Sequence, residues 1–280
     1  MKEELANKNP LRGKRVTVLG AGKMGSILLE ALLGQGLLLP EHTRATVQHG
    51  DRPRSASRLG VTPTTDNAKA ARGADIVLVC VKPGQVRQVL KEIAPVLAPK
   101  QLLVSIAASV PTAYMEKSLP AKIPVVRAMP NTPCAVGSGM TGLCKGAHAN
   151  QQHLELACLL FDAVGKTVVL DEKHMDAVTA LSASGPAYIY IILESLAEAG
   201  VKVGLPRDTA TLMAAQTTLG AARVVLETGD HPALLKDAVT TPAGCTIDGI
   251  LELEEGKLRV TLIKAVVKAA SRAKELLFAE

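Results

Sequence analysis

Hydrophobic residues follow two different patterns along the chain, and the change between them lies near residue 171. Before it, short continuous runs of β-branched and aliphatic residues alternate with segments long enough to form helices. Such runs are typical of parallel strands that are buried on both faces of a sheet. The runs that predict strands are residues 15–19, 45–48, 76–81, 102–106, 124–127 and 167–170. We therefore expect residues 1–171 to form a doubly wound α/β domain, with helices on both faces of a parallel sheet.

The second part of the chain, residues 172–280, is rich in Ala, Leu and Glu and is predicted to be all-helical. Gly and Pro residues separate the expected helices. These helices are residues 175–199, 207–227, 232–239, 246–253 and 257–277. The stretch 187–193 is apolar almost all round, so other protein must enclose it. Five helices are too few for that, and we expect a partner subunit to supply the remaining cover, as in a homodimer.

Composition narrows the classes of partner. The net charge is +6, but Lys and Arg are scattered along the chain, which holds three Tyr, two Phe and no Trp. A protein that binds single-stranded nucleic acid needs aromatic side chains on which bases stack. The expected partner is therefore a small anion and not a nucleic acid. No uninterrupted apolar stretch reaches the roughly 18 residues of a membrane span, so no membrane association is expected.

The cysteines and histidines indicate neither a disulfide framework nor a metal site. The five Cys form no C-x-x-C pair, and most lie in apolar runs, as expected of reduced thiols in a cytoplasmic protein. The charged N-terminus has no apolar segment behind it that would act as a secretory signal. The six His lack the spacing of a metal site, so we predict no bound metal.

A glycine-rich loop follows the first predicted strand directly and opens a helix expected over residues 26–33. Its sequence is G-A-G-K-M-G, and the residues expected to contact a cofactor are Gly20, Gly22, Lys23, Met24 and Gly25. In dinucleotide-binding folds of the Rossmann type the first glycine permits a tight turn and the second lets the backbone approach the pyrophosphate. The third allows the helix and the strand to pack closely, and the helix N-terminus faces the phosphates. The sequence therefore predicts a nicotinamide dinucleotide site.

The segment after the second predicted strand bears on which dinucleotide is bound. Sites for NADH place an acidic residue there to hold both ribose hydroxyls, whereas a 2′-phosphate is held by cations. Arg52, Arg54 and Ser55 occupy this segment and suit a 2′-phosphate, because guanidinium groups match its geometry. We predict NADPH as the cofactor. Asp51 keeps NADH as an alternative, in which case the arginines form a solvated loop.

A further loop, Val81, Lys82 and Pro83, ends the third long strand. Ligands of such folds bind outside the carboxyl ends of the strands, so this loop is expected to border the cofactor. A solvated loop cation is the alternative interpretation of Lys82.

Three later segments together resemble the pyrroline-5-carboxylate reductase family, and the likeness runs from the glycine loop nearly to the C-terminus. They are R-A-M-P-N-T-P at 127–133, A-S-G-P-A-Y at 183–188, and D-A-V-T-T-P-A-G-C-T-I at 237–247. Two departures stand out, since the family usually has Gly where Ala243 stands and Thr or Ala where Cys245 stands. Both residues are small, so the loop is expected to keep its path.

The resemblance implies reduction of the cyclic imine 1-pyrroline-5-carboxylate to L-proline, the last step of proline biosynthesis, with NADPH or NADH as hydride donor. It implies that Thr246 lies against the ring nitrogen as the catalytic residue and that Thr241, Gly244 and Cys245 belong to the substrate loop. It also places Asn131 among the cofactor contacts and allows pentamers of dimers.

The residues of the last segment suit this chemistry. A helix expected to begin near residue 247 leaves free backbone N–H groups and a positive dipole end for a small carboxylate. Thr241 and Thr246 add hydroxyl donors, although threonines at such a place often only cap the helix. Reduction of a protonated imine needs no strong general base, and the sequence shows none.

Two other functions remain open. One is a 3-hydroxyacid dehydrogenase, which joins similar domains. Enzymes of that kind resemble one another in carrying a catalytic Lys, with an Asn one turn later, on the long helix after the sheet. In this chain no Lys precedes Lys202 on that expected helix. A non-catalytic nucleotide-sensing scaffold would need no intact 237–247 segment.

Overall fold

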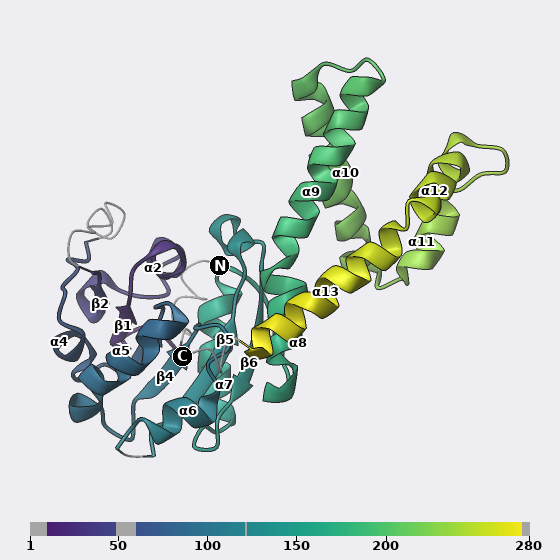
Figure 1. Cartoon of the computed structure of the whole chain (residues 1–280). Helices are drawn as coiled ribbons and strands as arrows, with labels where there is room; N and C mark the ends of the chain where they lie inside the picture. Colours follow the sequence, from purple (N-terminus) through teal and green to yellow (C-terminus); the bar gives the residue numbers. More distant parts are fainter. Residues whose placement is uncertain (1–9, 49–59, 121, 276–280) are drawn as a thin grey trace. The chain divides into compact units, whose positions relative to one another are not determined.

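The computed structural model describes residues 10–48, 60–120 and 122–275 (Figure 1). The chain divides into two compact units, of which the first comprises residues 1–183 and 269–280 and the second residues 184–268. The division therefore lies twelve residues beyond the expected boundary at 172, and the end of the chain returns to the first unit.

The first unit is built on a seven-stranded sheet with the order β2-β1-β3-β4-β5-β6-β7. All neighbouring strands are parallel except β5 and β6, which are antiparallel. The strands are β1 (Val16–Leu19), β2 (Thr43–Thr46), β3 (Ile76–Val79), β4 (Leu102–Ser105), β5 (Val125–Met129), β6 (Gly139–Lys145) and β7 (Gly165–Val169). The expected doubly wound domain is confirmed. Its last two strands, β6 and β7, run in the opposite direction to the other five.

Helices cover both faces of this sheet, which explains why its strands are apolar without alternation. On one face Ile76 and Leu78 of β3 belong to a core formed with helices α2 (Lys23–Gly34) and α7 (Gln151–Asp162). On the other face Val77 and Val79 join a core formed with α4 (Asn67–Ala71), α5 (Val86–Ile93) and α6 (Thr112–Lys117). Successive side chains of a strand point to opposite faces, so each face receives its own apolar set.

The strand β6 was not predicted, and its glycines are the reason. Gly139 and Gly142 interrupt the apolar pattern and lower the β propensity of the segment. A Cβ at Gly139 would lie 2.2 Å from Cys134 Sγ, and one at Gly142 would lie 2.8 Å from a methyl carbon of Val178. The glycines thus permit close packing on the strand, and its pairing with β5 is the one antiparallel pairing of an otherwise parallel sheet.

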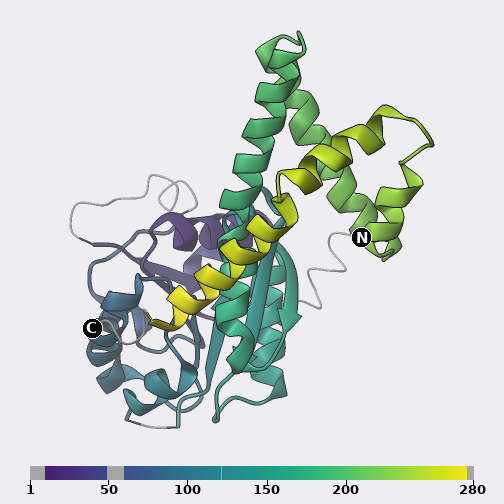
Figure 2. The same cartoon turned by 45° about the vertical axis from the view of Figure 1, so that its right-hand side comes forward.

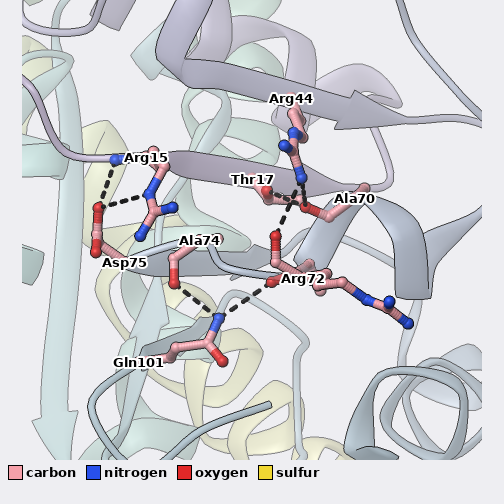
Figure 3. Close-up of polar contacts among 9 residues, drawn as sticks. Arg15, Thr17, Arg44, Ala70, Arg72, Ala74, Asp75 and Gln101 are labelled. Carbon is pink, nitrogen blue, oxygen red and sulfur yellow. Dashed lines mark hydrogen bonds and ion pairs between the residues drawn. The ribbon is translucent and has the colours of Figure 1, made fainter. Parts of the chain in front are cut away.

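Side chains from the amino ends of β2 and β4 hydrogen-bond to carbonyl oxygens at the carboxyl end of α4 (Figure 3). Arg44 Nη1 donates hydrogen bonds to the carbonyl oxygens of Lys69 at 3.2 Å and of Arg72 at 3.1 Å. The buried Gln101 donates to two further carbonyl oxygens of this region, those of Ala71 and Ala74. The last carbonyls of a helix have no partner within it, so these side chains fix α4 against the strands.

The segment that follows β7 belongs to the first unit. It contains η5 (Glu172–His174), α8 (Met175–Val178) and the π-helical turn η6 (Thr179–Ala183). Met175 is fully buried and Val178 packs over Gly142 of β6, so the sheet holds this segment. Because η6 interrupts the helix expected over 175–199, α9 (Gly185–Lys202) begins only at Gly185.

The second unit is all-helical, as expected. Its helices α9 and α10 (Arg207–Thr228) lie side by side (Figures 1 and 2), and α11 (Pro232–Ala238) and α12 (Cys245–Glu255) follow. The last helix, α13 (Leu258–Glu275), begins in this unit and ends in the first.

Many large apolar side chains of the second unit are exposed. Ile191 on α9 is 63% exposed and Leu212 on α10 is 68% exposed, whereas the buried residues of these two helices are alanines. In the described part of the chain, one helical run, Glu172–Lys202, is long and apolar enough by length and composition to cross a membrane. A helix whose apolar face is covered by another protein chain can have the same length and composition.

Candidate dinucleotide cleft and substrate loop

The glycine loop lies at the carboxyl end of β1 with the geometry that its sequence predicts. Gly20 has φ +89°, a left-handed conformation that favours glycine. A Cβ at Gly25 would lie 2.3 Å from the carbonyl oxygen of Gly20, so the helix can pack this closely on the loop only without a side chain. The helix α2 begins at Lys23, earlier than the expected residue 26, and Gly22 is its N-cap without a side-chain hydrogen bond. Its first N–H groups are therefore available to an anion.

Thr46, at the end of β2, holds this loop in place. Its Oγ1 accepts a hydrogen bond from Gly20 N at 3.1 Å and donates one to Asn67 Oδ1 at 2.7 Å. Its carbonyl oxygen accepts a bond from Ala21 N at 2.7 Å. Sequence reasoning missed Thr46, because its partners are distant in the chain. Gly20 and Ala21 precede it by 26 and 25 residues, and Asn67 follows it by 21 residues. The residue lies within the strand predicted over residues 45–48, but nothing local marks it as a support of the loop.

A cleft of about 540 Å³ opens beside the loop. It brings together most of the residues that the sequence assigns to the cofactor, namely Gly20, Gly22, Lys23, Met24, Val81, Lys82 and Pro83. Residues 106–108, which follow β4, complete the wall, and a smaller hollow of about 220 Å³ adjoins it at Gly20, Val47 and Gln48. The two hollows follow the carboxyl edge of the parallel strands, where ligands of such sheets bind.

The cleft wall also contains Cys80, which sequence reasoning did not place there. Burial raises the pKa of its thiol to about 12, so the group is neutral at physiological pH. A neutral, half-buried thiol contributes apolar surface and no nucleophile.

Asn131 does not line the cleft. Its Oδ1 accepts a hydrogen bond from Met140 N at 2.9 Å, and its Nδ2 donates one to the carbonyl oxygen of Ser182 at 3.2 Å. The amide thus joins the segment 127–133, one of those that carry the family resemblance, to β6 and to η6. A cofactor contact of Asn131 stays a prediction.

The predicted substrate loop precedes α12 in the second unit. Gly244 N donates a hydrogen bond to Thr241 O at 3.1 Å, and a Cβ at Gly244 would lie 2.3 Å from Thr241 Oγ1. The helix begins at Cys245 and its N-cap is Gly244, with no side-chain cap. Neither Thr241 nor Thr246 caps the helix, which removes the alternative interpretation of the threonines. Thr246 is half-buried in the first helical turn, and Cys245 is exposed.

Arg52, Arg54 and Ser55 lie outside the described residues. Within the described ranges no group of three or more His, Cys, Asp or Glu side chains is arranged to hold a metal ion.

A glycine loop at the carboxyl edge of a doubly wound sheet, followed by a helical unit, defines a nicotinamide-dinucleotide-dependent oxidoreductase. Two family models match the chain accordingly. The model of NADP oxidoreductases described as coenzyme F420-dependent matches residues 15–109, and the model of pyrroline-5-carboxylate reductase dimerisation matches residues 172–276.

Relatives extend this likeness over nearly the whole chain. A pyrroline-5-carboxylate reductase of Methanosarcina acetivorans is 41% identical, with 95% of this chain and 99% of the relative covered. One of Glycine max is 41% identical, with 95% and 97% covered. The chain belongs to the pyrroline-5-carboxylate reductase family.

Solved structures agree. The enzyme of Coxiella burnetii has a TM-score of 0.86 at 38% identity, with 94% of this chain and 98% of that chain covered. The enzyme of Plasmodium falciparum, solved with NADP bound, has a TM-score of 0.86 at 30% identity, with 95% and 98% covered. The fold and the oxidoreductase class predicted from the sequence are confirmed.

Proposed function

We propose that this chain reduces 1-pyrroline-5-carboxylate to L-proline with NADPH. The observation that carries the proposal is identity of 41% over almost the full length of a pyrroline-5-carboxylate reductase. The cleft beside the glycine loop supports the proposal as the place for the dinucleotide, and the uncapped start of α12 supports it as the place for the carboxylate of the imine acid.

The nicotinamide supplies a hydride to the imine carbon. The chain's own part is binding and orientation, since the reaction needs no fixed general base. The N-terminus of α2 binds the pyrophosphate, and the N–H groups that open α12 bind the carboxylate of the imine acid. The hydroxyl of Thr246 hydrogen-bonds to the ring nitrogen, with Thr241, Gly244 and Cys245 shaping the loop around the substrate.

The test is NADPH oxidation that depends on the imine, followed at 340 nm in the wild type and in Thr246→Ala. Loss of one hydrogen bond should lower kcat/KM by roughly 0.5 to 3 kcal/mol of transition-state stabilisation, with the KM for NADPH unchanged. Thr246→Val keeps the shape of the side chain and should be equally impaired. A wild-type enzyme without imine-dependent oxidation would overturn the proposal.

Within this proposal, Arg52, Arg54 and Ser55 hold the 2′-phosphate of NADPH, and Lys82 and Asn131 lie near the cofactor. The support for Lys82 is its place on the cleft wall at the N-cap of η2 (Pro83–Gln85). The support for the arginines is their charge and their place after β2.

The family's dimerisation segment indicates an oligomer, and we propose a homodimer in which a second copy covers the exposed face of α9 and α10, with pentamers of dimers as the larger assembly. This cover would account for the apolar run Glu172–Lys202 without a membrane. We propose a cytoplasmic location, which five free cysteines support.

A further inference from the structure

The four residues before α12 form a tight turn in an uncommon backbone state. Gly244 N donates to Thr241 O at 3.1 Å, which closes a β-turn with Pro242 and Ala243 at its centre. Ala243 has φ +56°. A type I turn has φ near −90° at this third position and a type II turn has a positive φ, so the turn is of type II.

The residue at the third position does not suit this turn. A positive φ brings the Cβ of an L-residue close to the carbonyl oxygen, which is why glycine or asparagine usually stands there. Pro242 fits the second position of type I and type II turns equally well. Both turns also keep the hydrogen bond between Gly244 and Thr241, so neither this bond nor Pro242 favours one turn over the other. Because a positive φ is unfavourable for alanine, Ala243 shifts the equilibrium between the two turns towards type I.

The two turns differ mainly in the peptide group between Pro242 and Ala243, which rotates by about half a turn between them. Gly244, on the C-terminal side, is held by two backbone hydrogen bonds, since its N–H donates to Thr241 O and its carbonyl oxygen accepts from Ile247 N. The rotation therefore changes which side of the loop the N–H of Ala243 faces, directly before the uncapped N–H groups of α12.

We propose that Ala243 is a positioning residue that sets the affinity of the substrate loop. The imine acid binds the type II form, and alanine lowers the share of free enzyme that has this form. Apparent affinity falls in proportion to that share, so a residue that accepts a positive φ raises affinity without a new contact. The inference rests on the proposed function, because it requires that this loop binds the substrate.

The experiment replaces Ala243 by Gly, Asn and Val in the full-length enzyme. The KM for the imine and the dissociation constant of the product L-proline, measured by calorimetry, should rise in the order Gly, Asn, Ala, Val. The step from Ala to Gly should be at most about fivefold, which is the full preference of glycine for this conformation. Both kcat and the KM for NADPH should stay unchanged.

Lys257 offers a matched control. It also has φ +56° and lies at the opposite end of α12, in the turn before α13. Lys257→Gly should raise Tm through the same relief of backbone strain and leave the KM for the imine unchanged.

Equal affinities across the Ala243 series would overturn the inference, as would a change confined to Tm, to kcat or to the KM for NADPH. An enzyme that reduces the imine, loses kcat/KM in Thr246→Ala and shows a flat Ala243 series would leave the proposed function intact. An enzyme inactive on the imine would instead remove the proposed function itself.

Discussion

A methyl group added at Gly25 and one added at Gly22 meet very different surroundings. The first would lie 2.3 Å from the carbonyl oxygen of Gly20, while the second has no protein atom within 4 Å. Gly22 also has φ −77°, which any residue can adopt. Packing therefore explains the glycine at 25 but not the one at 22, whose surroundings on the cleft wall are open.

We accordingly expect Gly25→Ala to lower Tm strongly, because the loop and α2 must separate. Gly22→Ala should fold with an unchanged Tm but raise the KM for NADPH by tenfold or more, since its methyl group occupies the path of the pyrophosphate. Thermal unfolding and steady-state kinetics check both. A Gly22→Ala enzyme with normal cofactor kinetics would show that the dinucleotide lies elsewhere.

The arginines after β2 carry the prediction on cofactor choice. If Arg52 and Arg54 hold a 2′-phosphate, replacing both by Ala should raise the KM for NADPH much more than that for NADH, by about 1.5 to 3 kcal/mol per lost charged hydrogen bond. Arg223→Ala, which removes an exposed charge on α10, serves as the control. Equal effects on both cofactors would refute the assignment.

The glycine loop was predictable from a local motif, whereas its support was not. Each glycine has its role within six residues of sequence. Thr46 acts through partners that only the folded chain brings near, as Gly20 and Asn67 show. Ala243 is a similar case, because the sequence shows a small residue and only the structure shows its positive φ.

Between elements, Asp75 joins the starts of β1 and β3 (Figure 3). Its Oδ2 accepts a hydrogen bond from Arg15 N at 2.7 Å, and Arg15 Nε lies 3.5 Å from the same oxygen. Partial burial would raise the pKa of Asp75, but the hydrogen bonds and the charge of Arg15 outweigh it, and the pKa lies below its ordinary value.

A lowered pKa in the folded state stabilises the fold at pH values above the pKa of the unfolded chain, near 4, and this contribution is lost as the pH falls through the folded value. Asp75→Asn should therefore lower Tm at pH 7 and reduce the loss of Tm between pH 5 and pH 3. Differential scanning calorimetry over this range is the measurement. Parallel pH profiles of variant and wild type would contradict the assigned role.

The segment after β7 is fastened to the sheet by the buried Arg127. Its Nη1 donates to Glu172 at 3.4 Å, and Asp176 lies 3.8 Å from Nη2. The side chain of Arg127 is 4% exposed. Both acids lie between the sheet and η6, so this cluster fixes the path by which the chain leaves the first unit.

Arg127→Met should destabilise the first unit by about 1 to 3 kcal/mol, because it leaves the partly exposed carboxylates of Glu172 and Asp176 without their cation. Urea denaturation measures this. Arg207→Ala removes an exposed partner of Glu198 and should leave the midpoint unchanged. Similar midpoints for Arg127→Met and the wild type would show that the cluster is not a support.

At this scale, continuous apolar runs and Gly or Pro breaks were enough to predict six of the seven strands and the helices of the second unit. The seventh, β6, contains glycines that the packing of Cys134 and Val178 requires, and these hide the strand pattern. The break at η6 was also missed, because Asn131 satisfies the carbonyl of Ser182 from 51 residues away.

At the scale of the whole molecule, large apolar side chains of the helical unit are left exposed to solvent in a single chain. Ile191→Glu places a charge on the exposed apolar face of α9 and should shift the enzyme towards monomers in light scattering, with loss of activity. Tyr114→Glu, at an exposed apolar position on α6 of the first unit, should leave the oligomer intact. A stable oligomer of Ile191→Glu would place the interface on another face.

The return of the chain to the first unit affects how the protein is made. Ala273, at the end of α13, is 4% exposed and belongs to the unit that residues 1–183 begin. The 85 residues of Ser184–Lys268 separate the two parts. At about 5 to 20 residues per second, a ribosome needs roughly 4 to 17 s to synthesise them. During this time the first unit lacks its last helical segment. The unit whose synthesis begins first is therefore completed only after the inserted helical unit has been synthesised.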